Sequence, residues 1–246
     1  MQDQSEASPC LALDAATPEA LGDDVIERLR AIAVQHGAVA AGTRIFRAGE
    51  PFRAIYGVRL GAIKAIRYDE SGEEQVVAFH LPGEFFGLTG IHSDHYVNTA
   101  VALERTAVCG LPYQRLFHVA NEHPRLRRQL MRLMSGVILT EQDQYAAMAG
   151  HTADARLAFL LLDLRERMSR GGTLRDRLRL PMTRAELGSS VGLAPETTSR
   201  VFQQFRRHEL IEASGRNIRF LDLAGMRRLA VPLTHPGHGT GRTTAA

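Results

Sequence analysis

Residues 182–220 constrain the fold of this chain more narrowly than any other segment. Thr183 is followed three residues later by Glu186, which is the spacing of a capping box, in which two side chains satisfy free backbone amides at the start of a helix. We therefore predict a short helix from residue 185 to about 191. Gly192 follows it and can adopt the backbone conformation that a tight turn needs.

A second helix is predicted to begin at Pro195, because proline fits the first helical position. Its apolar residues recur every three or four positions, which predicts a buried face made of Val201, Phe202, Phe205 and Leu210. Its other face carries these polar side chains: Glu196, Thr197, Ser199, Arg200, Gln203, Arg206 and Arg207. Residues 211–213 and 217–220 then flank Ser214-Gly215-Arg216, a pattern typical of a small hairpin. The whole segment predicts a winged helix-turn-helix.

The polar face has the chemistry of a DNA-reading surface. In helix-turn-helix proteins, residues near the N-terminus of the second helix contact base edges, so we expect Glu196, Ser199 and Arg200 to do so. An arginine can donate two hydrogen bonds to guanine and a glutamate can accept one from cytosine, which implies a G·C pair in the site. The side chains expected to meet phosphates lie further along: Gln203, Arg206 and Arg207. On the motif alone, the alternative of two ordinary amphipathic helices stays open.

The charge distribution supports DNA binding by the C-terminal part. Residues 153–232 contain 15 arginines against 9 Asp and Glu, whereas residues 1–152 contain 14 basic and 18 acidic residues. A basic module that follows an acidic one is expected when only the C-terminal module faces phosphates.

Residues 38 to about 115 consist of short alternating segments separated by glycines. They contain these residues of strand type: Val58, Ala62, Ala65, Val76, Val77, Phe79, Val101 and Val108. Residues 69–73 are predicted to form a turn between two strands. The pattern predicts an antiparallel β-roll or barrel.

Residues 124 to about 148 predict one helix, about 37 Å long at about 1.5 Å per residue. Such a helix is too long for a small barrel to bury. One face of it carries a row of residues at alternating three- and four-residue steps, which would form a seam with the same helix of a second copy: Met131, Met134, Ile138, Glu141, Tyr145 and Met148. Glu141 would face its twin, which makes the interface marginal and suited to a switch. A twofold dimer agrees with the two half-sites that helix-turn-helix proteins commonly read. The alternative is a helix packed only on its own barrel.

Length and composition fit two folded domains, with 246 residues of which 44% are hydrophobic. No apolar run of 18 or more residues and no secretory signal pattern occurs, so we expect a cytoplasmic protein. Residues 1–20 and 233–246 are expected to be flexible. Cys10 and Cys109 give no disulfide framework, and no C-x-x-C motif is present for zinc.

The order of these parts resembles that of the cyclic AMP receptor protein/FNR superfamily of bacterial transcription regulators. Four segments match that superfamily at similar intervals: IFRAGEP, GEEQVVAFHLPGEFFG, HPRLRRQLMRLMSG and PETTSR. The likeness runs from about residue 35 to 232 and is greatest to the FNR-type branch, whose signature is E-x-x-S-R. It implies an α+β fold with a β-roll sensor domain (21–123), a dimerisation helix and hinge (124–152) and a winged helix-turn-helix domain (153–232).

In that branch, the resemblance implies that Glu196, Ser199 and Arg200 read a TTGAT half-site of a TTGAT-N4-ATCAA palindrome, with Arg200 on the guanine. The cyclic AMP receptor branch has an Arg before the Glu and a Gly before the last Arg, where this chain has Pro195 and Ser199, so TGTGA sites are disfavoured. We expect a homodimeric transcription activator of genes for low-oxygen or nitrogen-oxide respiration. Residues 89–96 are expected to form a surface loop, which resembles in position the segment that FNR-type activators present to RNA polymerase. The candidate contacts are Thr89, Gly90, Ile91, His92, Ser93 and Asp94.

The resemblance also bears on what the barrel binds. Members that bind cyclic nucleotides hold the phosphate with a Glu and an Arg-Ser or Arg-Thr pair. Glu84 is present here, but Asn98 stands where the arginine belongs, which removes the main source of phosphate affinity. We therefore do not expect cyclic AMP to bind.

FNR itself holds a [4Fe-4S] cluster on four cysteines. Cys109 matches the strand ligand and Cys10 lies in the N-terminal segment, but two thiolates cannot complete the set. A cluster with atypical ligands is the alternative, and a small buried apolar residue is the simpler role for Cys109.

Cluster-less members of the branch include the denitrification-regulator type, which responds to nitric oxide through haem, and the FixK type, which is regulated by its abundance. Both types stay open. Haem needs one accessible imidazole, for which the candidates are His80, His92, His95, His118 and His123.

Two other classes of function are compatible with parts of the sequence. A small-molecule sensor module without a DNA role would keep the barrel, but it has no reason to keep PETTSR beside a basic face. An enzyme is not expected, because no nucleophile, base and orienting group recur at catalytic spacing and no phosphate-binding P-loop is present.

Overall fold

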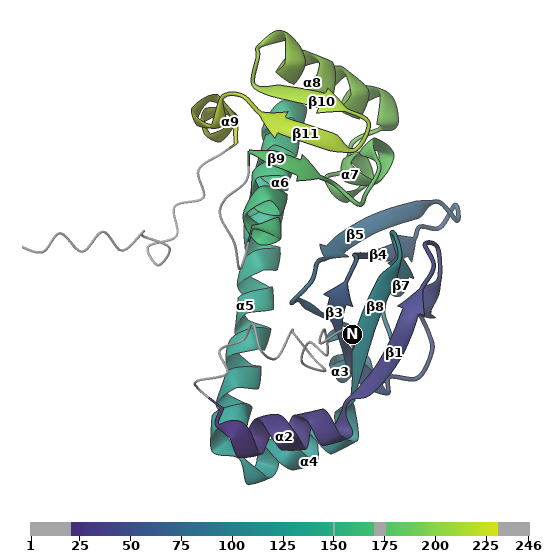
Figure 1. Ribbon diagram of the computed structural model, residues 1–246. Helices are drawn as coiled ribbons and strands as arrows, with labels where there is room; N and C mark the ends of the chain where they lie inside the picture. The colour runs from purple at the N-terminus through teal and green to yellow at the C-terminus, as the bar shows by residue number, and fades with distance from the viewer. Residues whose placement is uncertain (1–20, 150, 170–175, 231–246) are drawn as a thin grey trace, which may run out of the picture.

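The computed structural model describes residues 21–149, 151–169 and 176–230. Its N-terminal part is a β-barrel with helices at one end and along one side (Figure 1). The strands of the barrel are β1 (Val34–Val39), β2 (Arg44–Phe46), β3 (Ala54–Leu60), β4 (Ile63–Tyr68), β5 (Glu74–His80), β6 (Phe85–Phe86), β7 (Thr99–Ala102) and β8 (Thr106–Pro112).

The eight strands form two antiparallel sheets, with strand orders β1-β8-β3-β6 and β2-β7-β4-β5. Aromatic rings fill the space between the sheets: Phe46 stacks on Tyr96 with 3.8 Å between ring centroids. The turn between β4 and β5 is held by Asp69, whose carboxylate accepts hydrogen bonds from the amides of Ser71 and Glu73. The predicted β-roll, with its turn at residues 69–73, is confirmed.

Helices α2 (Asp23–Ile32) and α4 (Tyr113–Glu122) pack together at one end of the barrel, and α5 (Pro124–Met148) runs from there along the barrel (Figure 1). A short helix, α3 (Gly90–Ser93), follows β6. In α5 only Leu126 and Ala147 are fully buried. The long helix predicted over residues 124 to about 148 is confirmed, and the described part of the chain buries few of its side chains.

The C-terminal domain lies at the far end of α5 (Figure 1). It consists of α6 (Ala153–Met168), β9 (Arg177–Arg179), α7 (Arg184–Ser190), α8 (Pro195–Arg207), β10 (Ile211–Ser214), β11 (Asn217–Phe220) and α9 (Leu223–Leu229). Its three strands form a sheet in the order β10-β11-β9. The two predicted short helices and the hairpin are confirmed, so the predicted winged helix-turn-helix is present.

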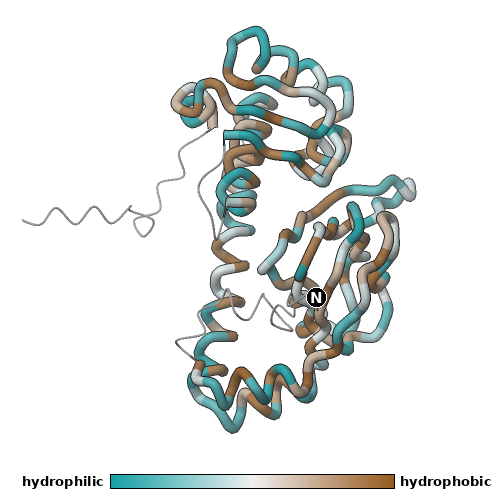
Figure 2. The backbone as a smooth tube through the Cα atoms, viewed as in Figure 1, coloured by the Kyte–Doolittle hydropathy of each residue, from teal (hydrophilic) through white to brown (hydrophobic). Residues whose placement is uncertain are grey.

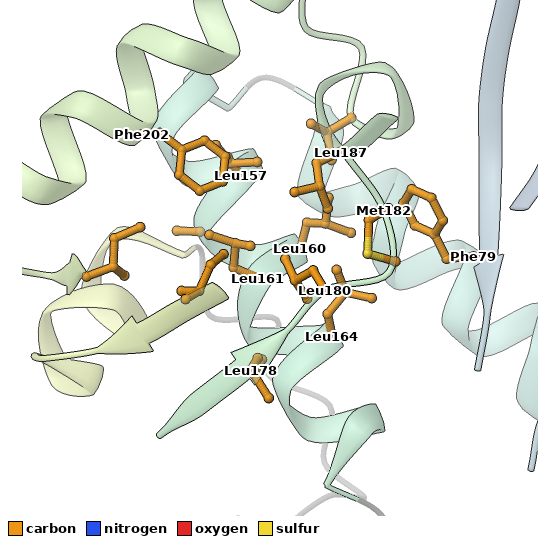
Figure 3. Close-up of a cluster of buried hydrophobic side chains, with 14 of the residues drawn as sticks. Phe79, Leu157, Leu160, Leu161, Leu164, Leu178, Leu180, Met182, Leu187 and Phe202 are labelled. Carbon is orange, nitrogen blue, oxygen red and sulfur yellow. The ribbon is translucent and has the colours of Figure 1, made fainter. Parts of the chain in front are cut away.

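One apolar cluster runs through both domains. Leu157, Leu161 and Leu164 of α6 are fully buried at its centre. The cluster reaches Phe202 of α8 on one side, and on the other side Phe79 of β5, which lies beside Met182 in Figure 3. The C-terminal domain is therefore packed against its own barrel.

Some expectations need correction. Leu210 is buried but lies beyond the end of α8, and Ala62 lies in the turn between β3 and β4 because Gly61 reverses the chain there with a φ of 79°. Helices α2, α3, α4, α6 and α9 and strand β9 were not foreseen, and α3 lies in the segment that was expected to be a loop. Cys10 and the two segments expected to be flexible, residues 1–20 and 233–246, lie outside the described residues.

We predict that Phe205→Ala lowers the free energy of unfolding by about 3–5 kcal/mol, because the ring is fully buried and its removal leaves a cavity. Urea denaturation followed by circular dichroism measures the loss. Phe117→Ala is the matched control: its ring is 53% exposed, and its loss should cost about 0.5 kcal/mol or less. Equal losses for the two variants would contradict the assignment of Phe205 to the core.

Candidate nucleic-acid interface

The first helix of the motif, α7, begins with the predicted capping box. Thr183 Oγ1 accepts a hydrogen bond from the Glu186 amide at 3.2 Å, and Glu186 Oε2 accepts one from the Thr183 amide at 2.7 Å. The helix covers Arg184–Ser190, one residue earlier than expected. Gly192 has a φ of 66°, which confirms its role in the turn.

Close packing of the two helices depends on Gly188. A Cβ atom there would overlap Thr198 Oγ1 and would lie 3.0 Å from the Leu193 carbonyl oxygen, so α7 and α8 could not approach as they do. Thr198 is fully buried at this contact, and its hydroxyl donates to the Ala194 carbonyl at 3.0 Å.

The second helix, α8, begins at Pro195 and buries one face. Val201, Phe202 and Phe205 of this face are buried in the apolar cluster. The guanidinium of Arg184 lies over the Phe202 ring, 4.8 Å from its centroid, which adds a cation–π contact between the helices. The buried face thereby determines which side of α8 points outward.

The outward side of α8 carries the predicted DNA-reading residues. Thr197 is half-buried, and these six are exposed: Glu196, Ser199, Arg200, Gln203, Arg206 and Arg207. Within the described part of the chain, none of the six side chains is held by a hydrogen bond or an ion pair. They are therefore free to contact an external partner.

The hairpin of β10 and β11 stands beside α8. Its tip has Gly215 in the left-handed region, with a φ of 57°, followed by the exposed Arg216. Strand β9 pairs with β11, with Leu178 opposite Ile218, and anchors the hairpin to the core. The tip thus carries a further exposed arginine in the same domain as α8.

Helix α5 has exposed apolar side chains that the described part of the chain does not cover. Hydrophobic and hydrophilic residues alternate along the helix (Figure 2). Of the predicted seam, Met131 is 60%, Ile138 56% and Tyr145 76% exposed. Glu141 is also exposed, whereas Met134 and Met148 are half-buried. A helix with this many exposed apolar side chains is suited to pairing with another helix.

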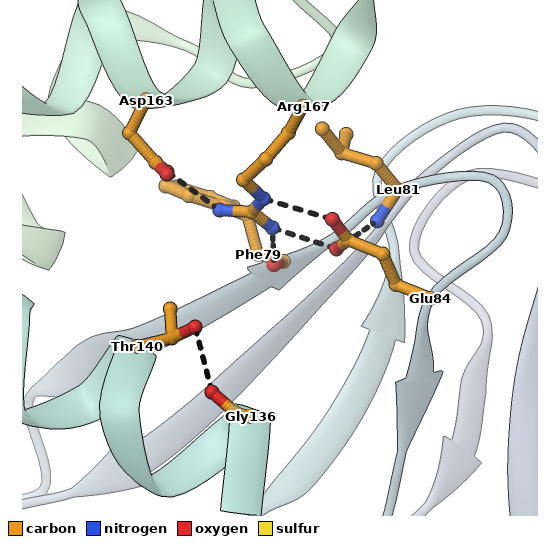
Figure 4. Close-up of polar contacts among 7 residues, drawn as sticks. All are labelled: Phe79, Leu81, Glu84, Gly136, Thr140, Asp163 and Arg167. Carbon is orange, nitrogen blue, oxygen red and sulfur yellow. Dashed lines mark hydrogen bonds and ion pairs between the residues drawn. The ribbon is translucent and has the colours of Figure 1, made fainter. Parts of the chain in front are cut away.

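Glu84, which matches the phosphate-clamp glutamate of members that bind cyclic nucleotides, is engaged within the chain (Figure 4). Glu84 accepts hydrogen bonds from Arg167 of α6, with Nε–Oε1 2.9 Å and Nη2–Oε2 2.7 Å. Arg167 also donates to the Phe79 carbonyl at 2.6 Å and to Asp163 at 2.8 Å. Burial alone would raise the pKa of Glu84, but the Arg167 guanidinium outweighs it and the pKa is lowered. The carboxylate is therefore charged and already bound.

The second element of a cyclic-nucleotide site is also occupied. Asn98 Oδ1 accepts a hydrogen bond from Arg67 Nε at 2.7 Å. Its neighbour Thr99 is buried and accepts a hydrogen bond from the Ala48 amide at 3.0 Å. These residues do not fit the expected phosphate clamp.

The candidate metal and haem ligands are scattered. Cys109 is fully buried in β8, and His80 stacks on Phe86, with 5.5 Å between ring centroids. Burial, together with the charge of Arg167, lowers the pKa of His80 to about 4, so this imidazole is neutral at pH 7. Of the remaining candidates, His123 is half-buried, and three are exposed: His92, His95 and His118. Within the described residues, no three His, Cys, Asp or Glu side chains lie together as a metal would require.

The segment expected at the surface, residues 89–96, is only partly exposed. Gly90 is buried because the Phe52 ring lies against it. A Cβ atom on Gly90 would be 2.5 Å from Phe52 Cδ2. Tyr96 is buried in the barrel core. Ile91 is half-buried, and four of the candidate contacts are exposed: Thr89, His92, Ser93 and Asp94.

Sequence reasoning missed the contacts that join the two domains. Lys64 of β4 forms an ion pair with Glu186 at 3.0 Å, and Ser189 Oγ accepts a hydrogen bond from the Val76 amide at 2.9 Å. Arg167 was missed as well. Lys64 offered a weak signal, as the single lysine in a chain of 29 arginines, but nothing in the sequence names its partner.

Comparisons with known proteins agree with this arrangement. Residues 37–123 match the cyclic nucleotide-binding domain family, and residues 155–229 match the Crp-like helix-turn-helix domain family. The chain is 41% identical to the transcriptional activator protein FnrA of Stutzerimonas stutzeri, over 89% of this chain and 87% of that protein. It is 34% identical to the fumarate and nitrate reduction regulatory protein of Vibrio cholerae, over 90% and 88%.

Among solved structures, that of FixK2 from Bradyrhizobium japonicum is similar, with a TM-score of 0.74 and 26% identity over 82% of this chain and 100% of that chain. No helix within residues 21–149, 151–169 or 176–230 is both long and apolar enough to span a membrane.

We predict that Thr183→Ala lowers the free energy of unfolding by about 1 kcal/mol, because it removes the side-chain cap of α7. Urea denaturation of the full chain measures it. Thr152→Ala is the matched control, since Thr152 occupies the same position before α6 but makes no capping hydrogen bond. A loss for Thr152→Ala as large as that for Thr183→Ala would show that the capping contact is not the cause.

Proposed function

Because the chain belongs to the CRP/FNR family of transcription regulators, we propose that it is a homodimeric activator that reads a TTGAT-N4-ATCAA palindrome. Family members are DNA-binding regulators and not enzymes.

The observation that carries the proposal is the exposed side of α8. Glu196, Ser199 and Arg200 are exposed near its N-terminus, with no other contact in the described part of the chain to compete with bases. Arg200 has the donors to bind guanine O6 and N7 together, and Glu196 can accept from a cytosine amino group. Arg206 and Arg207 lie further along, where they would meet phosphates. The resemblance of PETTSR to the FNR-type signature supports TTGAT as the half-site.

Dimerisation is proposed to use α5. Met131, Ile138 and Tyr145 are exposed at heptad spacing, and burying large apolar side chains against a second copy is favourable. Glu141 in the same row would face its counterpart, which keeps the association weak enough to regulate.

The genes controlled are proposed to serve respiration without oxygen or with nitrogen oxides. The name of the relative from Vibrio cholerae, a fumarate and nitrate reduction regulatory protein, supports this. Cyclic AMP is not proposed as the signal, because Arg167 already holds Glu84 and Asn98 supplies no charge for a phosphate. A [4Fe-4S] cluster is not proposed either, since the sequence contains two cysteines.

Contact with RNA polymerase is proposed through the exposed residues beside α3. Thr89, His92, Ser93 and Asp94 are accessible there, whereas the buried Gly90 acts only by letting this segment pack on Phe52.

An electrophoretic mobility shift assay with a TTGAT palindrome tests the proposal. The wild type should bind it more tightly than random DNA of equal length. Arg200→Ala should weaken operator binding by about 1–3 kcal/mol and relax discrimination at the guanine. Arg206→Ala is the comparison, because loss of a phosphate contact should weaken operator and random DNA alike. Equal losses on both DNAs for Arg200→Ala would refute base reading by Arg200.

Sedimentation velocity tests the dimer. Ile138→Glu should shift the protein to monomer, because it places two carboxylates at the centre of the seam. Leu139→Glu is the matched control, since Leu139 is also exposed but lies one position off the seam. A monomeric wild type, or dissociation by Leu139→Glu alone, would rule out the proposed interface.

A further inference from the structure

Helices α5 and α6 are separate helices and do not form one continuous helix. The backbone leaves the helical conformation at Ala149, with a ψ of 112°, and α6 begins only after Thr152, with a ψ of 159°. The orientation of the C-terminal domain is therefore set by side-chain contacts, some with the end of α5 and others with the barrel.

Arg167 makes the most specific of these contacts. Its three guanidinium nitrogens donate to Glu84, the Phe79 carbonyl and Asp163, and Glu84 accepts a further hydrogen bond from the Leu81 amide at 3.0 Å. The side chains of Arg167 and Glu84 are only 9% and 18% exposed. We call this group the Arg167–Glu84 bridge. A bidentate pair has one allowed geometry, whereas apolar surfaces can slide over one another.

The bridge acts on the element that carries α8. Arg167 lies near the C-terminal end of α6, and Leu157 and Leu161 of α6 share the buried cluster with Phe202 of α8. Two contacts at α7 support the same docking, the Lys64–Glu186 ion pair and the hydrogen bond from the Val76 amide to Ser189. Holding α6 against the barrel therefore holds α8 as well.

We propose that the Arg167–Glu84 bridge sets the orientation of α8 relative to α5 and thereby the spacing between half-sites that the dimer accepts. This inference rests on the proposed function, and it adds the device that selects one spacer length. With the bridge in place, both copies of α8 are oriented before they meet DNA. Without it, DNA binding itself must order both domains, which lowers affinity for the full palindrome. The bridge does not inhibit binding by covering α8, because its polar face is exposed while the bridge is formed.

Docking is measured first, without DNA, by hydrogen exchange of the full-length protein. The Val76 amide donates to Ser189 across the domain boundary, so exchange in a peptide containing Val76 reports whether the domains stay together. Exchange should rise in Arg167→Gln, and in Glu84→Gln, which removes the charge from the barrel side. Arg228→Gln is the matched control, because it breaks an exposed ion pair with Asp222 in the same domain. Unchanged exchange in both bridge variants would overturn the proposal.

Half-site spacing is then measured with palindromes whose spacers have two to six base pairs, and with a single half-site. The wild type and Arg228→Gln should prefer one spacer. The bridge variants should bind that palindrome about tenfold more weakly, equivalent to about 1.4 kcal/mol, and discriminate less among spacers, with unchanged affinity for the single half-site. Equal or tighter binding of the palindrome, or a retained spacer preference, would overturn the proposal. Failure of the wild type to bind any palindrome would instead refute the proposed function, whatever the exchange data show.

Discussion

Burial of α6 on nearly all sides is the constraint on which the rest of the structure depends. Leu157, Leu161 and Leu164 are fully buried, and the cluster around them includes residues of α7, α8, the hairpin and β5. Because the aromatic side of α8 packs against α6, the polar side of α8 points away from the core. The exposure of the polar side of α8, which we propose reads DNA, is therefore a consequence of where α6 buries its leucines. The same burial brings the C-terminal domain against the barrel, so the position of α8 and the docking of the two domains have a common origin.

The winged helix-turn-helix could be predicted in detail because its signals are local. The capping box at Thr183, the turn at Gly192 and the helix start at Pro195 each depend on residues within a few positions of one another. The apolar period of α8 likewise specified its buried side, except that Leu210 continues the period after the helix has ended. The barrel and α5 were predicted for similar reasons, from alternation between glycines and from a long stretch without proline.

The elements that were not foreseen depend on contacts distant in the sequence. Helix α6 has leucines on several sides, so its sequence shows little helical period, and its burial follows only from the domains that surround it. Gly90 appeared to belong to a surface loop because nothing nearby in the sequence indicates that Phe52 packs on it. Glu84 was matched to the phosphate-clamp glutamate of other family members, because a motif shows which side chain is present and not which partner it meets. Its partner, Arg167, lies 83 residues later in the chain.

The bond between Glu84 and Arg167 changes what the barrel can do. A ligand that needed Glu84 would have to displace a buried guanidinium, and removing one partner of a buried pair costs about 3–5 kcal/mol. Weak ligands could not supply that energy, so a signal that acts through Glu84 would need strong compensating contacts, and Asn98 offers no charge for them. A signal that changes the pairing of α5 faces no such barrier, because Ile138, Glu141 and Tyr145 are already exposed. We therefore expect control of this protein to act through assembly of the dimer while the two domains of each chain stay docked.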